Sequence, residues 1–202
     1  MTVNNLFNQY LKGIEMFFRD QGFKRNGYCF HQKRFENLIL LNIQKSNLST
    51  TEVIEFTFNI GICSVYLLSF YQIEDKLPET DDWHWRKRIG NFLPANEDVW
   101  LKISETTNIQ ELVKYSIELF NKYVFPELRN NSTDEELVTQ WLNKNSPGLT
   151  EFQRLLNLTA LLSKTNLDTI YLNVKSELLN YAQKNRLSIS YHLNKLDEVK
   201  PD

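Results

Sequence analysis

The chain has 202 residues, and its 42% hydrophobic and 13% aromatic content is typical of a globular protein with an ordered core. Its 23 basic and 25 acidic side chains give a net charge of −2, which excludes a broad basic field for nucleic acid and a polyacidic tail. Two cysteines in a chain of this length do not make a disulfide framework.

The first predicted element is an amphipathic helix over residues 6–18. Apolar residues recur there at helical spacing and form one stripe, which comprises Leu6, Phe7, Tyr10, Leu11, Ile14, Phe17 and Phe18. Gly22 is placed to end this helix, because glycine is common just beyond a helix C-terminus.

After Gly22 the pattern changes to strict alternation, which predicts three half-buried strands over residues 28–35, 38–46 and 53–62. In the third strand Ile54, Phe56, Phe58 and Ile60 share one face, while Glu55, Thr57 and Asn59 share the other. One apolar and one polar face indicate antiparallel neighbours, and a short connection at Glu36-Asn37 would join the first two strands as a hairpin.

Residues 64–76 fit either a strand or a short helix, and a polar loop follows them. The alternating pattern resumes in "WHWRKRIG" and "EDVWLKIS", which the Pro94-Ala95-Asn96 turn separates. Thr107 with Gln110 predicts a capping box at the start of the next helix.

From Asn130 onward the chain has helical patterns throughout. Two further capping boxes are predicted at Thr133 with Glu136 and at Thr150 with Gln153, and "NSPGL" separates the helices that they open. A last helix carries one apolar stripe of Leu167, Ile170, Tyr171, Val174, Leu178 and Tyr181.

Several stretches, taken in order, resemble a bacterial family known as domain of unknown function 4304. They are "GFKRNGYCF" (22–30), "LNIQKS" (41–46), "EFTFNIGI" (55–62), "HWRKRIG" (84–90) and "DVWLKI" (98–103). The resemblance covers about the first 125 residues. It implies a helix packed on an antiparallel sheet and then another helix, and it implies no activity. The helical part after Asn130 lies outside it.

Common catalytic and cofactor motifs are missing from the sequence. No P-loop, GxGxxG, GxSxG or HExxH pattern occurs. Cys29, His31, Cys63 and His84 suggest zinc by residue type, but their spacing matches no standard zinc motif, and a buried cysteine is more often a small hydrophobic residue. A Cys63–His84 nucleophile pair is conceivable, with two unrelated half-buried side chains as the simpler interpretation.

The strongest candidate surface is a polar face of the predicted sheet. In residues 83–90, Trp85 and Ile89 should turn into the core, which leaves His84, Arg86 and Arg88 on the opposite face. The candidate binding residues are Arg86, Arg88, His84, Trp100, Gln44, Asn42, Asn59, Thr57 and Glu55. The guanidinium groups of Arg86 and Arg88 could bind a carboxylate or phosphate through bidentate hydrogen bonds. The alternative is a structural ladder in which an arginine pairs with Glu55 and Trp100 covers arginine stems.

The sequence therefore predicts an α+β fold: an N-terminal helix on an antiparallel sheet of about five strands, followed by helices. We expect a domain over residues 1–128 and a docked helical extension over 129–202. Neither a charged start followed by an apolar run nor an apolar stretch of membrane-spanning length occurs, so a reduced cytoplasm is expected.

The expected function is a non-enzymatic binding or interaction module of a bacterial cytoplasm, accessory or immunity-like by analogy. Its partner would be another protein or a small anionic ligand, and no cofactor, metal, nucleic acid or membrane is expected. The alternative is an enzyme whose small phosphate or carboxylate substrate is bound by Arg86 and Arg88.

Overall fold

The computed structural model describes residues 2–73 and 76–199, which form two compact units. Unit 1 comprises Met1–Arg34, Leu38–Gly61 and Lys87–Asn131. Unit 2 comprises Phe35–Asn37, Ile62–Arg86 and Ser132–Asp202. The helices after residue 132 therefore share a unit with residues 62–86. The sequence-based boundary at residue 128, and the docking of residues 129–202 on the first domain, stay predictions.

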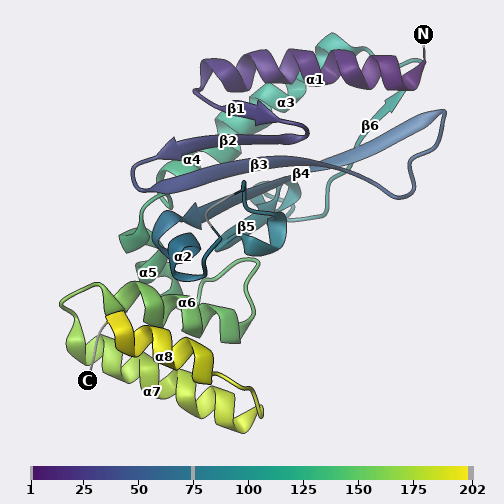
Figure 1. The fold of residues 1–202 in the computed structure, drawn as a ribbon. Helices are drawn as coiled ribbons and strands as arrows, with labels where there is room; N and C mark the ends of the chain where they lie inside the picture. Colours follow the sequence, from purple (N-terminus) through teal and green to yellow (C-terminus); the bar gives the residue numbers. More distant parts are fainter. Residues whose placement is uncertain (1, 74–75, 200–202) are drawn as a thin grey trace. The chain divides into compact units, whose positions relative to one another are not determined.

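Helix α1 (Val3–Asp20) opens unit 1 (Figure 1), and most of its predicted apolar stripe is buried, namely Phe7, Tyr10, Leu11, Ile14 and Phe18. The Thr2 side chain accepts a hydrogen bond from the Asn5 amide and caps the N-terminus. The chain leaves the helix through Gln21 and then Gly22, whose φ of +89° is the left-handed conformation that glycine adopts at low cost. The predicted helix and its stop are confirmed.

The sheet contains six strands among the described residues, against about five expected, and it is antiparallel as predicted. They are β1 (Lys24–Asn26), β2 (Cys29–Arg34), β3 (Asn37–Lys45), β4 (Val53–Ser64), β5 (Trp85–Arg88) and β6 (Leu101–Ser104). The order is β1-β2-β3-β4-β5, and β6 also pairs with β4, with Phe56 opposite Leu101. Strand β1 was not predicted, because three residues are too few for alternation to be recognised.

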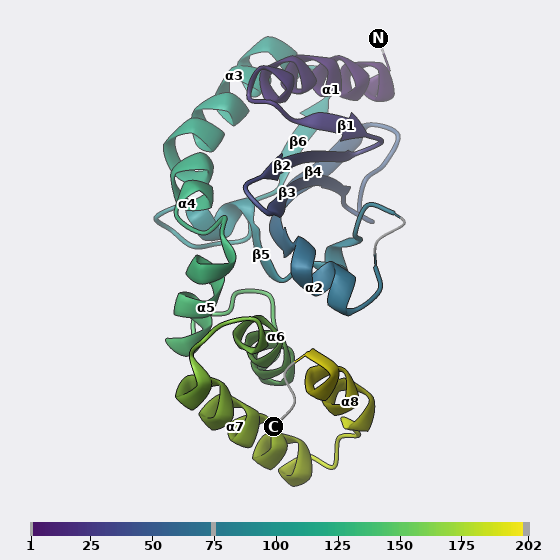
Figure 2. The same cartoon turned by 60° about the vertical axis from the view of Figure 1, so that its left-hand side comes forward.

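The core of unit 1 consists of aromatic rings from α1 and the sheet. The rings of Phe7 and Phe56 lie 5.4 Å apart, and those of Phe18 and Phe58 lie 6.2 Å apart. Helix α3 (Ile109–Leu119) runs beside α1, as Figure 2 shows, and the Tyr10 hydroxyl lies 2.8 Å from that of Ser116. The edge-to-face contacts between these phenylalanine rings stabilise the core beyond what the burial of their apolar surface contributes.

Helix α3 begins at Ile109, with Asn108 as its N-cap, so the predicted capping role of Thr107 was wrong. The Asn108 side chain accepts from two amides of the first turn, whereas the Thr107 hydroxyl accepts from the Ser104 amide instead. Asparagine and threonine are both good caps, and the local sequence alone does not choose between neighbouring candidates.

A π-helical turn, Phe120–Val124, joins α3 to α4 (Phe125–Arg129). Here the Phe125 amide donates to Phe120 O, five residues back. Pro126 follows at the start of α4 and has no amide hydrogen to donate to the preceding turn. The wider turn accommodates the proline and changes the direction in which the side chains of α4 project.

Unit 2 is built around α6 (Glu151–Ser163), most of which is buried. It contacts α2 (Val65–Phe70), α5 (Asp134–Leu142), α7 (Asp168–Lys184) and α8 (Ser190–Val199). Residues 65–70 are thus helical, which decides between the two alternatives for this segment. Both predicted capping boxes are present, at Thr133 with Glu136 and at Thr150 with Gln153.

The strand predicted over residues 83–90 is shorter in the structure, since β5 spans Trp85–Arg88 and a 3₁₀ turn, Ile89–Phe92, follows. Trp85 and Ile89 are fully buried, as predicted. A Cβ placed on Gly90 would lie 1.8 Å from the carbonyl oxygen of Glu97, so the backbone at residue 97 packs directly against this glycine.

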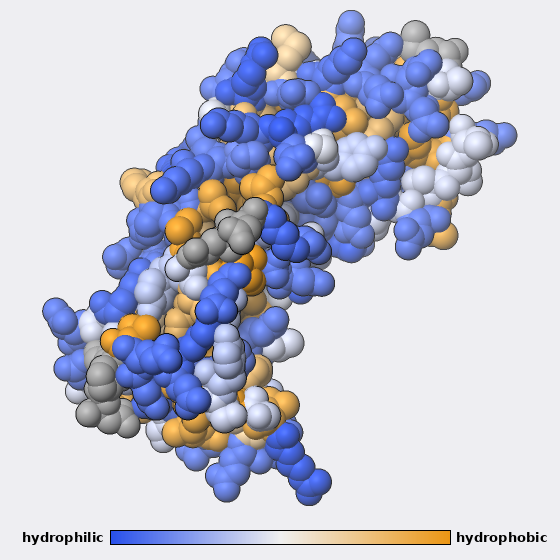
Figure 3. Space-filling model, viewed as in Figure 1, coloured by the Kyte–Doolittle hydropathy of each residue, from blue (hydrophilic) through white to orange (hydrophobic). Residues whose placement is uncertain are grey.

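Most of the surface in Figure 3 is hydrophilic, and apolar residues form separate patches on it. Within the described part of the chain, helices lack the combination of length and apolar character needed to cross a bilayer.

Candidate functional site

Arg88, in unit 1, has a carboxylate and an aromatic ring as partners. Its Nη1 donates to Asp98 Oδ2 at 2.8 Å, and its Cζ lies 5.4 Å from the centre of the Trp100 ring. Trp100 Nε1 donates to the same Asp98 oxygen at 3.0 Å. The indole therefore covers the guanidinium, and the carboxylate that pairs with Arg88 is Asp98, not the Glu55 that the structural alternative from the sequence named.

Arg86, in unit 2, is held by a short loop that precedes it. Its Nη1 donates to Thr80 O at 2.8 Å and to Asp81 Oδ1 at 2.7 Å. Its stem packs so closely on Gly148 that a Cβ there would lie 2.0 Å from Arg86 Cγ. Both candidate arginines thus have acidic partners in their own units. An anion site made by Arg86 and Arg88 stays a prediction.

The remaining residues of the predicted polar face largely pair with each other or are buried. Glu55 forms an ion pair with Lys102 at 2.7 Å, and Asn59 Nδ2 donates to Gln44 Oε1 at 2.9 Å. Thr57 is fully buried, and its hydroxyl has no hydrogen-bond partner among the described residues. Asn42 is half-buried, and His84 is buried in unit 2.

The four side chains considered for zinc are divided between the units. Cys29 and His31 belong to unit 1, and Cys63 and His84 belong to unit 2. Among the residues that the structure describes, no three His, Cys, Asp or Glu side chains lie close enough together to hold a metal ion. His84 Nδ1 accepts a hydrogen bond from the Ser64 amide at 3.1 Å, which leaves that nitrogen unable to act as a base toward Cys63.

A different group of residues forms a pocket of about 180 Å³ within unit 1. We call it the arginine pocket; it is lined by Gln21, Phe23, Gln32, Arg34, Ile39, Phe125, Leu128 and Arg129. Of these described lining residues, two carry a positive charge and none carries a negative charge. The combination of apolar walls with a few polar groups is typical of small-molecule sites.

The floor of the arginine pocket is apolar and closely packed. The rings of Phe23 and Phe125 stack with centroids 6.2 Å apart and an interplanar angle of 21°. Ile39 and Leu128 are almost completely buried beside them. Phe125 takes its place directly after the π-helical turn, so the bend before Pro126 helps to shape this floor.

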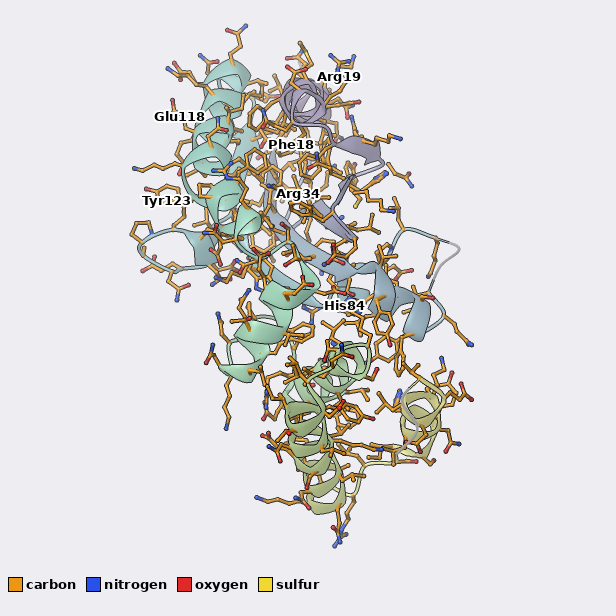
Figure 4. The ribbon with its side chains drawn as sticks, turned by 90° about the vertical axis from the view of Figure 1, so that its left-hand side faces the viewer. Phe18, Arg19, Arg34, His84, Glu118 and Tyr123 are labelled. Carbon is orange, nitrogen blue, oxygen red and sulfur yellow. The ribbon has the colours of Figure 1, made fainter. Side chains whose placement is uncertain are left out.

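The polar rim comes from three elements, namely the end of α1, strand β2 and the end of α4. Gln32 Nε2 donates to Gln21 O at 3.0 Å, which ties β2 to the end of α1. Arg34 is the last residue of β2 and Arg129 the last of α4. Arg34 lies between the sheet and the helical segment α3–α4 in Figure 4. Two guanidinium groups on one pocket produce a positive potential that attracts anions.

Arg34 and Arg129 were not predicted as site residues from the sequence, although an anionic ligand was expected. The two arginines are almost one hundred residues apart in the chain, and each follows an ordinary amphipathic segment. A spacing signal is therefore missing, and the two arginines line one pocket only because α4 packs beside the start of the sheet, where the Phe125 ring stacks on that of Phe23.

Comparison with known proteins places most of unit 1 in a family without an assigned function. The family model described as "Domain of unknown function (DUF4304)" matches residues 14–130. These residues include all of the arginine pocket. Neither the curated proteins nor the solved structures contain a match. Since the matched region spans more than half of the chain, the protein belongs to the DUF4304 family.

Proposed function

We propose that the protein is a binding module for small organic anions and that the arginine pocket is its site. The observation that carries the proposal is the pair Arg34 and Arg129 on one apolar-floored pocket whose described lining residues include no acid. A carboxylate or phosphate would lie against the guanidinium groups, because their planar forks match the geometry of these anions.

The apolar floor favours an anion that has an apolar body. The stacked rings of Phe23 and Phe125 line the pocket and can contact an aromatic or aliphatic group of the ligand. A small inorganic anion would leave this surface uncovered and gain nothing from apolar burial. We therefore expect aromatic carboxylates and phosphate esters to bind more tightly than inorganic phosphate.

The chemistry of the lining supports binding over turnover. The described residues that line the arginine pocket include no histidine, cysteine, serine or carboxylate side chain. They therefore supply no general base. The proposal includes a bacterial cytoplasmic setting, which rests on the sequence resemblance and on the low number of cysteines, two in 202 residues.

A ligand panel tests this function. Thermal unfolding of the full chain is measured with phenyl phosphate, benzoate, inorganic phosphate and the neutral analogue benzamide. We expect stabilisation by phenyl phosphate and benzoate that weakens as salt is added, and none by benzamide. Equal shifts with benzamide and benzoate, or no shift with any anion, would contradict the proposal.

A further inference from the structure

A second pocket, of about 210 Å³, is lined entirely by residues of unit 2. We call it the histidine pocket; its lining residues are Tyr71, Ile73, Asp81, Asp82, Trp83, His84, Leu149, Gln153, Leu156 and Asn157. It shares no residue with the arginine pocket, and its charged groups are carboxylates.

Three side chains that line the pocket have an acceptor atom already engaged, so the remaining N–H group of each can only donate. His84 Nδ1 accepts from the Ser64 amide at 3.1 Å, so the neutral ring carries its proton on Nε2. Burial lowers the pKa of His84 to about 4, which keeps the ring neutral near pH 7. Among the described residues, Nε2 has no partner, although the side chain is only 4% exposed.

The two amides follow the same rule. The Tyr71 hydroxyl donates to Asn157 Oδ1 at 2.7 Å, and Gln153 Oε1 accepts from the amide and the hydroxyl of Thr150 at 2.9 and 3.0 Å. Their NH₂ groups have no partners among the described residues, and Asn157 is only 5% exposed. A ligand oxygen in the pocket can accept hydrogen bonds from these N–H groups, and such bonds would fix its orientation.

Two carboxylates supply the opposite chemistry on the same pocket. One oxygen of Asp81 accepts from Arg86 at 2.7 Å, and one oxygen of Asp82 accepts from the Glu79 amide at 2.8 Å. The second oxygen of each carboxylate has no partner within the described part of the chain. The Asp81 side chain is 97% exposed, so this end of the pocket faces solvent and suits a positively charged group.

The walls between these groups are apolar, with Ile73, Trp83, Leu149 and Leu156. A ligand that satisfies all three parts needs acceptor oxygens at one end, a cation nearby and an apolar substituent. We propose that the histidine pocket binds a free α-amino acid with an apolar side chain. Its carboxylate is held by His84, Asn157 and Gln153, and its ammonium group is held by Asp81 and Asp82.

Calorimetric titration of the full chain with leucine and its derivatives tests the ligand class. We expect leucine to bind and N-acetylleucine to bind at least tenfold more weakly, because acetylation removes the cation. Glycine should also bind at least tenfold more weakly, because it has no apolar side chain. The dipeptide Leu-Gly separates a peptide N-terminus from a free amino acid, and equal or tighter binding of Leu-Gly would overturn the assignment.

Isosteric substitutions test the residues. Asn157→Asp keeps the acceptor for Tyr71 but replaces the NH₂ donor by an oxygen. Gln153→Glu keeps the capping box, because glutamate caps at this position as well as glutamine does. Each variant should bind leucine at least tenfold more weakly. The matched control is Asn166→Asp, which makes the same change of charge at an exposed residue of unit 2 outside the pocket.

The outcomes separate clearly. Loss of leucine binding in Gln153→Glu with unchanged binding in the control supports the site, even if Asn157→Asp fails to fold. Wild-type affinity in Gln153→Glu, or no binding by leucine, methionine or phenylalanine to the unmodified protein, would overturn it. Binding of phenyl phosphate at the arginine pocket is measured in the same samples, so failure of one site does not imply failure of the other.

Discussion

The imidazole of His84 accepts a hydrogen bond from the backbone amide of Ser64 at 3.1 Å, and the ring is almost completely buried. Burial lowers the pKa of His84 to about 4, and the negative charge of Asp134 opposes this shift only in part. The folded state therefore resists protonation of this residue, whereas the unfolded chain takes up the proton near the ordinary histidine pKa of about 6.5.

This difference predicts the direction of the pH dependence. The stabilising contribution of neutral His84 is fully present above about pH 6.5 and is lost progressively as the pH falls toward 4. The loss should approach about 1.4 kcal/mol per pH unit within that window. Denaturant unfolding between pH 4 and 8 measures it.

A control variant isolates the contribution of His84. His84→Asn keeps an oxygen near the position of Nδ1 to accept from Ser64, but it does not titrate. The stability of this variant should depend less on pH between 4 and 6.5 than that of the unmodified protein. His31 and His192 remain in both proteins, so the difference between the two pH profiles reports His84. Identical pH profiles would show that His84 is not the group responsible.

Gly90 should tolerate no side chain. An alanine Cβ would lie 1.8 Å from Glu97 O, so the backbone must shift, and we expect Gly90→Ala to cost about 1–3 kcal/mol or more. Gly27→Ala is the matched control, since a Cβ there meets nothing within 4 Å. At Gly27 the positive φ of +60° alone should cost about 1–2 kcal/mol. Chemical denaturation compares the two, and a smaller loss for Gly90→Ala would contradict the close contact.

Removal of residues 131–202 should cause aggregation. Helix α6 contacts α2 within unit 2, and the buried side chains of α2 include Leu67 and Leu68. Without α6 these residues would be exposed, and exposed apolar patches promote association. Light scattering and size-exclusion chromatography of residues 1–130 measure the effect. A soluble, monomeric and cooperatively unfolding fragment would show that the first 130 residues fold without the later helices.

The regular elements of unit 1 could be predicted because their periodicity is long. Helix α1 shows its stripe over five turns, and β3 and β4 alternate over nine residues or more. Short elements could not be predicted in this way. Helix α2 has six residues and β1 has three, and within such lengths helix and strand patterns are difficult to distinguish.

The candidate site could be predicted only in its chemistry. Alternation correctly gives the side-chain direction of Trp85, but it does not show that Thr57 and His84 are buried. An anionic ligand was expected from arginines in one strand. The structure instead brings Arg34 and Arg129 to one pocket through contacts between elements distant in sequence, which no local pattern reports.

The double variant Arg86→Gln with Arg88→Gln separates the two possible anion sites. If both residues are structural, the change should cost about 0–1 kcal/mol for each partly exposed ion pair and leave binding of phenyl phosphate unchanged. Loss of that binding with the fold intact would instead support the site predicted from the sequence. Thermal unfolding with and without phenyl phosphate measures both effects.

The most direct test of the account is a calorimetric titration of phenyl phosphate into the unmodified protein, Arg129→Gln and Arg34→Gln. The matched control is Arg19→Gln, which removes the same charge from an exposed residue of unit 1 outside the pocket. The account predicts a loss of at least about tenfold in affinity, or about 1.4 kcal/mol, for each pocket variant and little change in the control. Equal affinities in Arg129→Gln, Arg34→Gln and the unmodified protein would contradict an anion site in the arginine pocket.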